Sequence, residues 1–253
     1  MIADLERRFP ALEDPRTGTR IGIGVASGCD DVYISSDSPD AGSNRLLPLV
    51  MASDIQAGTI EWSGRHLVNP WKDGRLVELG NFPWLGAYYE VNGDRLWGRH
   101  VAKKQPRSWY LTIDRIDPGL LAKPKLLLPD MKAAAHPVLD PGDHYPHHNL
   151  YFVVSDAWDL EVLGGILLSD ITNLFVGGYC VKMRGGTYRF QAQYLHRIRV
   201  PDPSTSQARV RILRDAFRLR DTAKATTAVA AAYGIDASFF TGGWKIDRSP
   251  WRP

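Results

Sequence analysis

Short apolar runs separated by turn-forming residues fill the first half of the chain. Arg20–Val25 and Val32–Ser35 contain β-branched residues and are joined by a Gly/Asp segment, which predicts a β-hairpin. Trp84–Val91 has apolar residues three and four positions apart, a spacing that predicts a short helix. Further strands are predicted where apolar runs recur, at Leu46–Val50, Leu67–Val68 and Lys125–Pro129. The first half is therefore predicted to consist mainly of strands and loops.

One strand and one long helix are predicted in the middle of the chain. Asn149–Val154 is predicted to form a strand, because the five residues after Asn149 are all apolar. Over Leu160–Phe175 apolar residues recur every three or four positions, which predicts a single helix with one buried stripe. Its cap is predicted at Asp156 or Asp159, because a carboxylate there accepts the unpaired N–H groups of the first turn. The glycine pair that follows is predicted to end the helix.

Two further helices are predicted near the C-terminus. The first opens at a cap formed by Ser204 or Thr205 and carries five arginines mostly outside its apolar face. The second covers Thr222–Tyr233, and Gly234 stands where a left-handed residue ends a helix. The segment 130–148 is rich in Pro, Gly, His and Asp, which predicts a long loop.

These elements predict an α+β fold, with mixed strands and loops first and helices concentrated in the C-terminal half. The 253 residues are expected to form one compact domain, with possible sub-lobes at 15–130, rich in strands and loops, and at 131–253, a strand plus helices. Hydrophobic residues make up 44% of the chain and charged residues 23%, which is typical of a globular protein. This composition excludes a disordered tail and a fibrous repeat.

The cysteine content and the lengths of the apolar runs give no indication of a secreted or membrane-spanning protein. Cys29 and Cys180 by themselves cannot form a disulfide framework or a four-ligand zinc site. Every apolar stretch ends well before the roughly 18 residues that a membrane span needs. The first residues carry acids and lack the apolar core of a signal peptide. We therefore expect a cytoplasmic chain with no membrane partner.

The charge is distributed unevenly although its total is only +3. Residues 1–98 hold 9 Lys/Arg against 14 Asp/Glu, and residues 149–177 hold 4 acids and no basic residue. Positive charge is concentrated in residues 99–148, at 8 against 5, and in residues 178–220, at 10 against 2. Two basic blocks indicate a polyanion binder, although a helix with a solvated arginine face would give a similar pattern.

Two glycine- and proline-containing motifs resemble nucleotide chemistry only superficially. Gly22-x-Gly24-x-x-x-Gly28 is followed by a predicted strand, whereas a dinucleotide-binding turn leads into a helix. We therefore interpret these glycines as sites of close backbone packing. Asn69-Pro70-Trp71 lacks the second proline of the base clamp used by amino-methyltransferases, and we interpret it as a turn.

Histidines and acids in the predicted loop are potential metal ligands. They are His136, His144, His147 and His148, with Asp140 and Asp143. However, adjacent residues of a strand point to opposite faces, so His147 and His148 are not expected to share an ion. A polar loop that contacts phosphates is the preferred interpretation. A metal-dependent nuclease built on these residues is retained as an alternative.

Planar and basic side chains cluster in two segments. Arginine and glutamine can form bidentate contacts with guanine and adenine edges, and lysine suits phosphates. The alternative is a basic surface loop beside aromatic core residues. The first segment contains Arg99, Lys103, Lys104, Arg107, Trp109 and Tyr110, and the second contains Lys182, Arg184, Tyr188, Arg189, Gln191 and Gln193 around Gly185-Gly186.

The order of motifs between residues 20 and 236 resembles the C-terminal target-recognition region of TaqI-like adenine-N6 DNA methyltransferases and related restriction–modification enzymes. The resemblance rests on the following pieces: RIGIGVASGCDDVYI (20–34), Arg99 through Trp109-Tyr110, KPKLLLPDM (123–131), YPHHNLYFVV (145–154), the Leu-rich segment Leu163–Phe175, GTYRFQAQYLHRIRVP (186–201) and VAAAYGID (229–236).

The resemblance implies that the chain binds double-stranded DNA and selects its sequence beside a catalytic methyltransferase domain or subunit. In the family that catalytic part carries the methyl-donor pocket and an Asn-Pro-Pro-Tyr base clamp, neither of which is found in this sequence. S-adenosylmethionine is therefore expected only in the partner, and no catalytic residue, metal ligand or cofactor is predicted in this chain. The predicted DNA-binding residues are those of the two segments together with His147 and His148.

A second function class is compatible with the same residues. Tryptophan and tyrosine are frequent interface anchors, and Trp62, Trp71, Trp84, Trp97 and Trp109 are all in the first half. The chain is then a protein-interaction subunit that docks to a methyltransferase or restriction partner. Binding of DNA by the isolated chain distinguishes the two classes.

Overall fold

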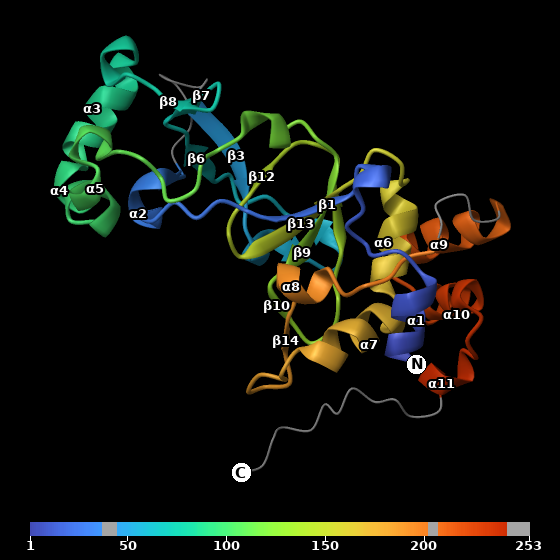
Figure 1. Cartoon of the computed structure of the whole chain (residues 1–253). Helices are drawn as coiled ribbons and strands as arrows, with labels where there is room; N and C mark the ends of the chain where they lie inside the picture. Colours follow the sequence, from blue (N-terminus) through green and yellow to red (C-terminus); the bar gives the residue numbers. More distant parts are fainter. Residues whose placement is uncertain (37–44, 202–206, 242–253) are drawn as a thin grey trace.

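A four-stranded sheet lies at the centre of the molecule (Figure 1). The computed structural model describes residues 1–36, 45–201 and 207–241. The strand order is β1 (Arg20–Ile23), β13 (Leu150–Val154), β9 (Lys125–Pro129) and β11 (Val138–Asp140), and all neighbours are antiparallel. Every residue of β9 and β13 is buried, as their continuous apolar sequences predict.

The two faces of this sheet contribute to two different hydrophobic cores. Because side chains alternate along a strand, Leu126 and Leu128 enter one core while Leu127 between them enters the other. In β13, Val153 faces the first core and Phe152 the second. Strands from both predicted sub-lobes thus meet in one sheet that is covered on both sides.

Helices cover the first face and form most of the C-terminal half, in agreement with the predicted α+β class. Gly164 and Gly165 lie where α6 (Leu160–Leu168) and α9 (Gln207–Leu219) approach each other, and a Cβ atom on Gly165 would lie 2.4 Å from the carbonyl oxygen of Leu213. These two glycines therefore allow close packing of the two helices. The helices of this layer are α1 (Ile2–Arg8), α6 (Leu160–Leu168), α7 (Asp170–Tyr179), α9 (Gln207–Leu219) and α10 (Thr222–Tyr233). A last short helix, α11, covers Ser238–Thr241.

The single helix predicted over Leu160–Phe175 is wrong, because α6 and α7 meet at Ser169 at an angle of 62°. Ser169 has an extended ψ of 155°, and its hydroxyl donates to the carbonyl of Ile166. The side-chain hydrogen bond satisfies the end of α6 and lets the chain turn. Gly177 lies inside α7 and does not end it.

The predicted helix ends were partly confirmed. Asp159 caps α6 by accepting from the backbone N–H groups of Glu161 and Val162. Gly234 follows α10 with a left-handed φ of 67°. The Ser204/Thr205 cap lies outside the described residues.

No single helix among the described residues is long and apolar enough to cross a membrane. α6 and α7 together reach that length and composition, but they are bent relative to each other.

A second layer covers the other face of the central sheet. Its sheet has the order β12 (Tyr145–Pro146), β3 (Leu46–Val50), β6 (His66–Val68) and β2 (Ile34–Ser35), which confirms the strands predicted near residues 46 and 67. The helix predicted over Trp84–Val91 is confirmed as α3. It is followed by two shorter helices on the left of Figure 1; the three are α3 (Pro83–Val91), α4 (Gly93–Trp97) and α5 (His100–Lys104).

The hairpin predicted from Arg20–Val25 and Val32–Ser35 is wrong. β1 pairs with β13, whereas β2 pairs with β6 of the other sheet. Between them Asp30–Tyr33 forms a short helix, α2, which buries Val32 and Tyr33 together. The backbone at Gly24 runs so close to His147 that a Cβ atom would lie 2.2 Å from its carbonyl oxygen, which confirms close packing at this glycine.

The remaining strands are short. The turn predicted at Asn69-Pro70-Trp71 is confirmed, because the Asn69 side chain accepts from the backbone N–H of Trp71 before a tight hairpin. The small ladders are β4 (Ile55–Gln56) with β5 (Thr59–Ile60), β7 (Trp71–Lys72) with β8 (Arg75–Leu76), and β10 (Met131–Lys132) with β14 (Tyr188–Arg189).

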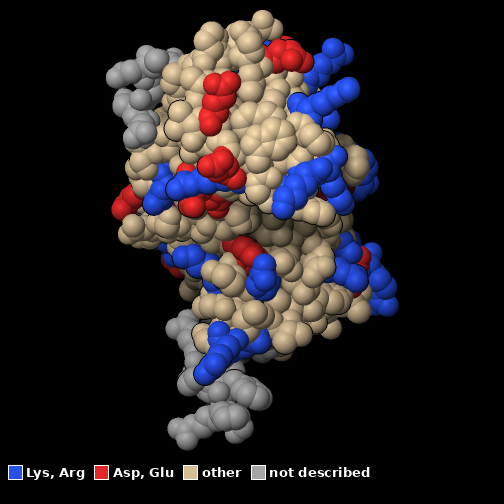
Figure 2. Space-filling model, turned by 90° about the vertical axis from the view of Figure 1, so that its left-hand side faces the viewer, with Lys and Arg blue, Asp and Glu red and all other residues tan. Residues whose placement is uncertain are grey.

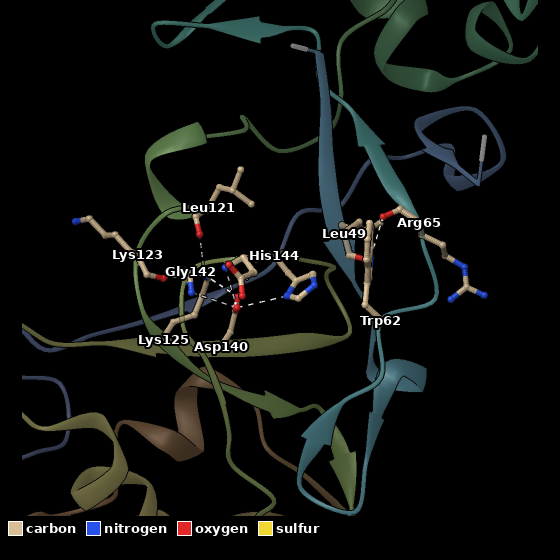
Figure 3. Close-up of polar contacts among 10 residues, drawn as sticks. Leu49, Trp62, Arg65, Leu121, Lys123, Lys125, Asp140, Gly142 and His144 are labelled. Carbon is tan, nitrogen blue, oxygen red and sulfur yellow. Dashed lines mark hydrogen bonds and ion pairs between the residues drawn. The ribbon is translucent and has the colours of Figure 1, made fainter. Parts of the chain in front are cut away.

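The predicted loop over 130–148 is more ordered than expected, since it contains β10, β11 and β12. Figure 3 shows what holds its centre: Lys125 and Asp140 are both fully buried and form an ion pair of 2.9 Å. Asp140 also accepts from the backbone N–H groups of Asp143 and His144, and Lys125 donates to two carbonyl groups. This hydrogen-bond network orders the middle of the segment for which the polar sequence predicted a long loop.

Candidate nucleic-acid interface

The two basic segments lie in separate parts of the molecule. In Figure 1, α5 lies at the left with α2 beside it at about the same height, and the loop between α7 and β14 projects from the lower middle part. Figure 2 looks onto the left-hand side of Figure 1 and shows Lys and Arg side chains along its right-hand edge, with others at its left and at its lower end. In Figure 1 the two predicted segments lie at the upper left and at the lower middle of the molecule.

Three basic side chains of the first segment are available to a ligand. Lys103 and Lys104 form the last turn of α5, and Arg107 follows in a short 3₁₀ turn; all three are exposed. None of them makes an ion pair with another described residue. Cations at the C-terminal end of a helix are also favoured by its dipole, so their position is stable without a partner.

Arg99, by contrast, is occupied within the fold. Its guanidinium donates to the carbonyl groups of Leu96, Trp109 and Leu111 and to the hydroxyl of Tyr33. It also lies over the ring of Tyr33 at 5.3 Å. Arg99 thus holds the chain after α5 against α2, and we remove it from the set of candidate DNA contacts.

The aromatic pair of the first segment also has structural roles. Trp109 stacks on Trp97 with ring centroids 5.1 Å apart, and Trp97 remains 45% exposed. Tyr110 is buried, and its hydroxyl donates to the carbonyl of Val77. Burial raises the pKa of Tyr110, which keeps the phenol neutral. Tyr110 therefore belongs to the aromatic core beside this basic segment, and Trp109 packs at its edge.

The second segment begins with a tight loop whose tip is exposed. The N–H of Met183 donates to the carbonyl of Thr187, and the N–H of Gly186 donates back to the carbonyl of Met183. Gly185 and Gly186 have φ values of 90° and 79°, which L side chains rarely adopt. The glycine pair therefore makes this reversal possible.

The side chains of this loop combine positive charge with apolar surface. Arg184 is exposed and Lys182 is partly exposed. Val181 and Met183 are 80% and 44% exposed, and Met131 of the adjoining β10 is 58% exposed. Exposed apolar side chains beside basic ones are suited to a ligand that offers both phosphates and stacked bases.

Arg189 is fixed by Asp130, a residue that the sequence analysis did not select. Its Nε and one terminal nitrogen donate to the two oxygens of Asp130 at 3.1 and 2.5 Å. The ion pair raises the pKa of Arg189. The other terminal nitrogen has no hydrogen bond to a described residue, and the side chain is 36% exposed. A braced arginine with a free outer edge is prepared for one further planar contact.

The neighbouring predicted residues differ in accessibility. Tyr188 is buried against α7 and supports the β10–β14 ladder through its backbone. Gln191 precedes α8 (Ala192–Leu195), and its amide oxygen accepts from Gln193, which is exposed. Gln193 is thus the more accessible of the two amides.

Part of the positive charge of residues 178–220 is neutralised by acids elsewhere in the chain. On α9, Arg214 pairs with Asp159, and Arg218 pairs with Glu161. Figure 1 places α9 on the right, away from the loop before β14. The acid-only segment 149–177 therefore balances part of this block, and the net charge of the sequence overstated the free positive charge.

The predicted histidine–aspartate cluster does not form. His136 contacts Arg220, and burial, together with that cation, lowers the pKa of His136 to about 4. His144 lies 3.4 Å from Asp140, whose oxygens already hold Lys125 and backbone N–H groups. Asp140 is therefore not available to a metal ion, so the metal-dependent nuclease hypothesis has no metal site there.

His147 and His148 are separated from those residues but not from each other. His147 is 3% exposed, and its Nε2 lies 3.2 Å from Asp30 of α2. His148 is exposed, and its ring centroid lies 4.0 Å from that of His147. The expectation that the two rings point to opposite faces is wrong, because they follow β12 in an irregular segment.

Sequence reasoning missed Asp130 and Asp30 because their partners are distant in sequence. Asp130 meets Arg189 across 59 positions, and Asp30 meets His147 across 117 positions. No local spacing signals such pairs. The exposed Val181 and Met183 carried a weak signal, since apolar residues alternate there with basic ones next to a glycine pair.

The chain is homologous to part of type II DNA methyltransferases, although no protein-family model matches it. It is 47% identical over 238 residues to the type II methyltransferase M.PaeR7I of Pseudomonas aeruginosa, which is 93% of this chain and 41% of that protein. The corresponding identity is 48% over 207 residues (81% and 37%) for M.BstVI of Geobacillus stearothermophilus, and 43% over 239 residues (93% and 43%) for M.XhoI of Xanthomonas vasicola. The chain thus spans about two fifths of the length of these relatives.

Two solved structures share the fold at low sequence identity. The type IIL restriction–modification enzyme MmeI, determined in complex with DNA, superposes with a TM-score of 0.63 at 14% identity, over 90% of this chain and 34% of that one. The type IIG restriction endonuclease BpuSI gives a TM-score of 0.54 at 12% identity, over 86% and 27%. The architecture therefore recurs as one part of larger restriction–modification enzymes.

Proposed function

We propose that this chain is the DNA target-recognition region of an adenine-N6 methyltransferase of a restriction–modification system. In this function it binds duplex DNA and selects the sequence, and another domain or subunit transfers the methyl group. The observation that carries the proposal is the exposed, basic loop before β14, with the braced Arg189 beside it, in a chain homologous to part of type II methyltransferases. The adenine preference rests on the family resemblance.

Phosphate contacts are assigned to the basic side chains without internal partners. Lys103, Lys104 and Arg107 are exposed near the end of α5, and Lys182 and Arg184 lie in the loop before β14. Each phosphate neutralised by such a side chain releases counterions, which makes the affinity fall steeply with salt. These contacts position the duplex and carry no sequence information by themselves.

Sequence readout is assigned to Arg189 together with Gln193. Asp130 occupies the Nε side of the Arg189 guanidinium, which leaves the outer pair of N–H groups for the O6 and N7 atoms of a guanine. Because the carboxylate already orders this side chain, less rotamer freedom is lost when it binds. Gln193 can add an amide contact to an adjacent base.

In relatives such as M.PaeR7I, about three fifths of the chain lie outside the part that matches this protein. We assign the methyl-donor site and the base-flipping pocket to a domain that corresponds to that part. The exposed part of the second layer is the proposed dock for that domain, because Trp97 of α4 is 45% exposed and Val91 of α3 is 87% exposed. This observation favours the protein-interaction function as a companion to DNA binding. Co-purification with a catalytic chain, abolished by Trp97→Ala together with Val91→Asp, tests it.

The decisive experiment is selection from a random duplex library followed by titration of the selected duplex. We expect a preferred sequence, bound more tightly than random duplex, with the logarithm of the affinity falling linearly with the logarithm of salt concentration. Arg184→Ala should weaken binding to both duplexes, whereas Arg211→Ala on the exposed face of α9 is the matched control and should leave it unchanged. Absence of any binding at low salt would refute the proposal for the isolated chain.

A further inference from the structure

Asp30, His147 and His148 converge from two distant parts of the chain. One potential ligand atom from each lies within 4.8 Å of the other two. Asp30 begins α2, and the two histidines follow β12, at the point where Val25 and His147 form an isolated β-bridge. Neither DNA contact nor the methyltransferase homology requires this arrangement.

The carboxylate is held so that one oxygen faces the histidines. The hydroxyl of Ser27 donates to Oδ1 of Asp30 at 2.5 Å, while Oδ2 lies 3.2 Å from Nε2 of His147. A hydrogen bond to the non-ligating oxygen is the kind of support that orients carboxylate ligands in metal sites. The Asp30 side chain is 44% exposed, so ions can reach it from solvent.

His147 is held in place by the surrounding fold. It is 3% exposed, and its Nε2 faces Oδ2 of Asp30 at 3.2 Å. An imidazole nitrogen is a common ligand of a transition-metal ion. Nδ1 of His147 is buried and has no hydrogen-bond partner among the described residues. Burial of the ring therefore holds Nε2 toward Asp30, where one metal ion could bind both atoms.

The third ligand is free to move into place. His148 is exposed, and its side chain makes no hydrogen bond to a described residue, although its ring centroid lies 4.0 Å from that of His147. Bonds of about 2.1 Å in a tetrahedral site place ligand atoms roughly 3.4 Å apart. The pair Asp30–His147 already meets that separation, and a rotation of His148 closes the rest.

We propose that Asp30, His147 and His148 form a binding site for a divalent transition-metal ion, with Zn²⁺ as its best occupant. Two imidazoles and one carboxylate suit Zn²⁺, Co²⁺ or Ni²⁺, whereas Mg²⁺ prefers a shell of oxygens. The fourth position stays open to water or to an anionic oxygen. Bound metal ties the start of α2 to the segment after β12, and thus stabilises a part of the side shown in Figure 2.

The test is a metal titration of the chain without DNA and without a histidine tag. After treatment with a chelator, the chain is titrated with ZnCl₂ by calorimetry and with CoCl₂ by visible absorption, in the presence of excess Mg²⁺. We expect one Zn²⁺ per chain, a rise in melting temperature with added Zn²⁺, and Co²⁺ bands of a four-coordinate site. Because no DNA is present, failure of the recognition function would not affect this result.

Two ligand variants and one control locate the site. His148→Ala removes an exposed ligand without disturbing the core, and Asp30→Asn removes the negative charge; both should weaken Zn²⁺ binding at least about tenfold. His100→Ala removes an exposed histidine on α5 and should leave the affinity unchanged. The proposal is overturned if stoichiometric binding is absent, or if His148→Ala binds Zn²⁺ as tightly as His100→Ala. Should Asp30→Asn fail to fold, His148→Ala decides.

Discussion

Two ion pairs of this protein contain the same kinds of charge and have opposite accessibility. Lys125–Asp140 is fully buried, and every polar atom of the pair is directed at a partner within the fold. Arg189–Asp130 has side chains that are 36% and 16% exposed, and the arginine retains unused N–H groups at the surface. The buried pair has no hydrogen-bonding group left for a ligand, whereas Arg189 of the exposed pair can still donate to one planar partner.

The difference shows why net charge was a poor guide to the DNA-binding surface. Lys125 contributes to the positive count of residues 99–148, but it cannot reach a ligand. Arg214 and Arg218 contribute to the larger block, but they pair with acids of α6 or its cap. A basic residue contributes to recognition only where the fold leaves its donors unsatisfied.

The largest effect is expected from Lys125→Met. Removing the lysine leaves Asp140 as a buried charge without its counterion, which should lower the free energy of unfolding by about 3–5 kcal/mol. Arg189→Met, measured in the same urea titrations, should cost about 1 kcal/mol or less, because Asp130 can be hydrated. Equal losses in the two variants would remove the distinction between the pairs.

Protonation of Asp140 in acid should lower the free energy of unfolding by less than Lys125→Met does. Burial alone would raise the pKa of Asp140, but hydrogen bonds from His144 and Lys125 outweigh it and lower the pKa from 3.8 to about 2. A carboxyl whose pKa is lower in the folded state stabilises the fold above its unfolded pKa. That contribution is lost as the pH falls through about 2. Unfolding measured between pH 5 and pH 2 should therefore depend less on pH in Asp140→Asn than in the wild type.

The exposed pair should affect discrimination between DNA sequences more than it affects stability. We expect Arg189→Ala to lower the affinity ratio of selected to random duplex by about 1–3 kcal/mol, roughly 5- to 150-fold. Asp130→Asn should lower the ratio less, since the arginine is kept but no longer braced. Unchanged ratios in both variants, measured by fluorescence anisotropy, would show that this pair does not contact bases.

The smallest effect is expected for single lysines at the end of α5. Lys103→Ala should weaken binding to selected and random duplexes alike and reduce the slope of log affinity against log salt by about 0.9. Lys224→Ala, an exposed lysine on α10 at the far side of the molecule in Figure 1, is the matched control. A change in sequence preference for Lys103→Ala would contradict its assignment to phosphate.

The sequence by itself determined the elements whose apolar pattern is complete in one segment. β9 and β13 were predictable because both of their faces are buried, so that residues 126–129 and Leu150–Val154 are continuous apolar runs. α10 was predictable because a helical run of alanines ends at Gly234, which adopts the left-handed conformation. In such cases local propensity and tertiary packing favour the same structure.

Only the tertiary structure decided which polar residues are free. Arg99 and Arg189 both lie in predicted recognition segments. Arg99 donates its hydrogen bonds to carbonyl groups inside the fold, whereas Arg189 is held at the surface by Asp130. Likewise, His148 meets Asp30 only because β12 and α2 are brought together. A hydrogen bond or metal site joins groups more than fifty positions apart as readily as neighbours, and for this reason sequence spacing alone could not reveal either partner.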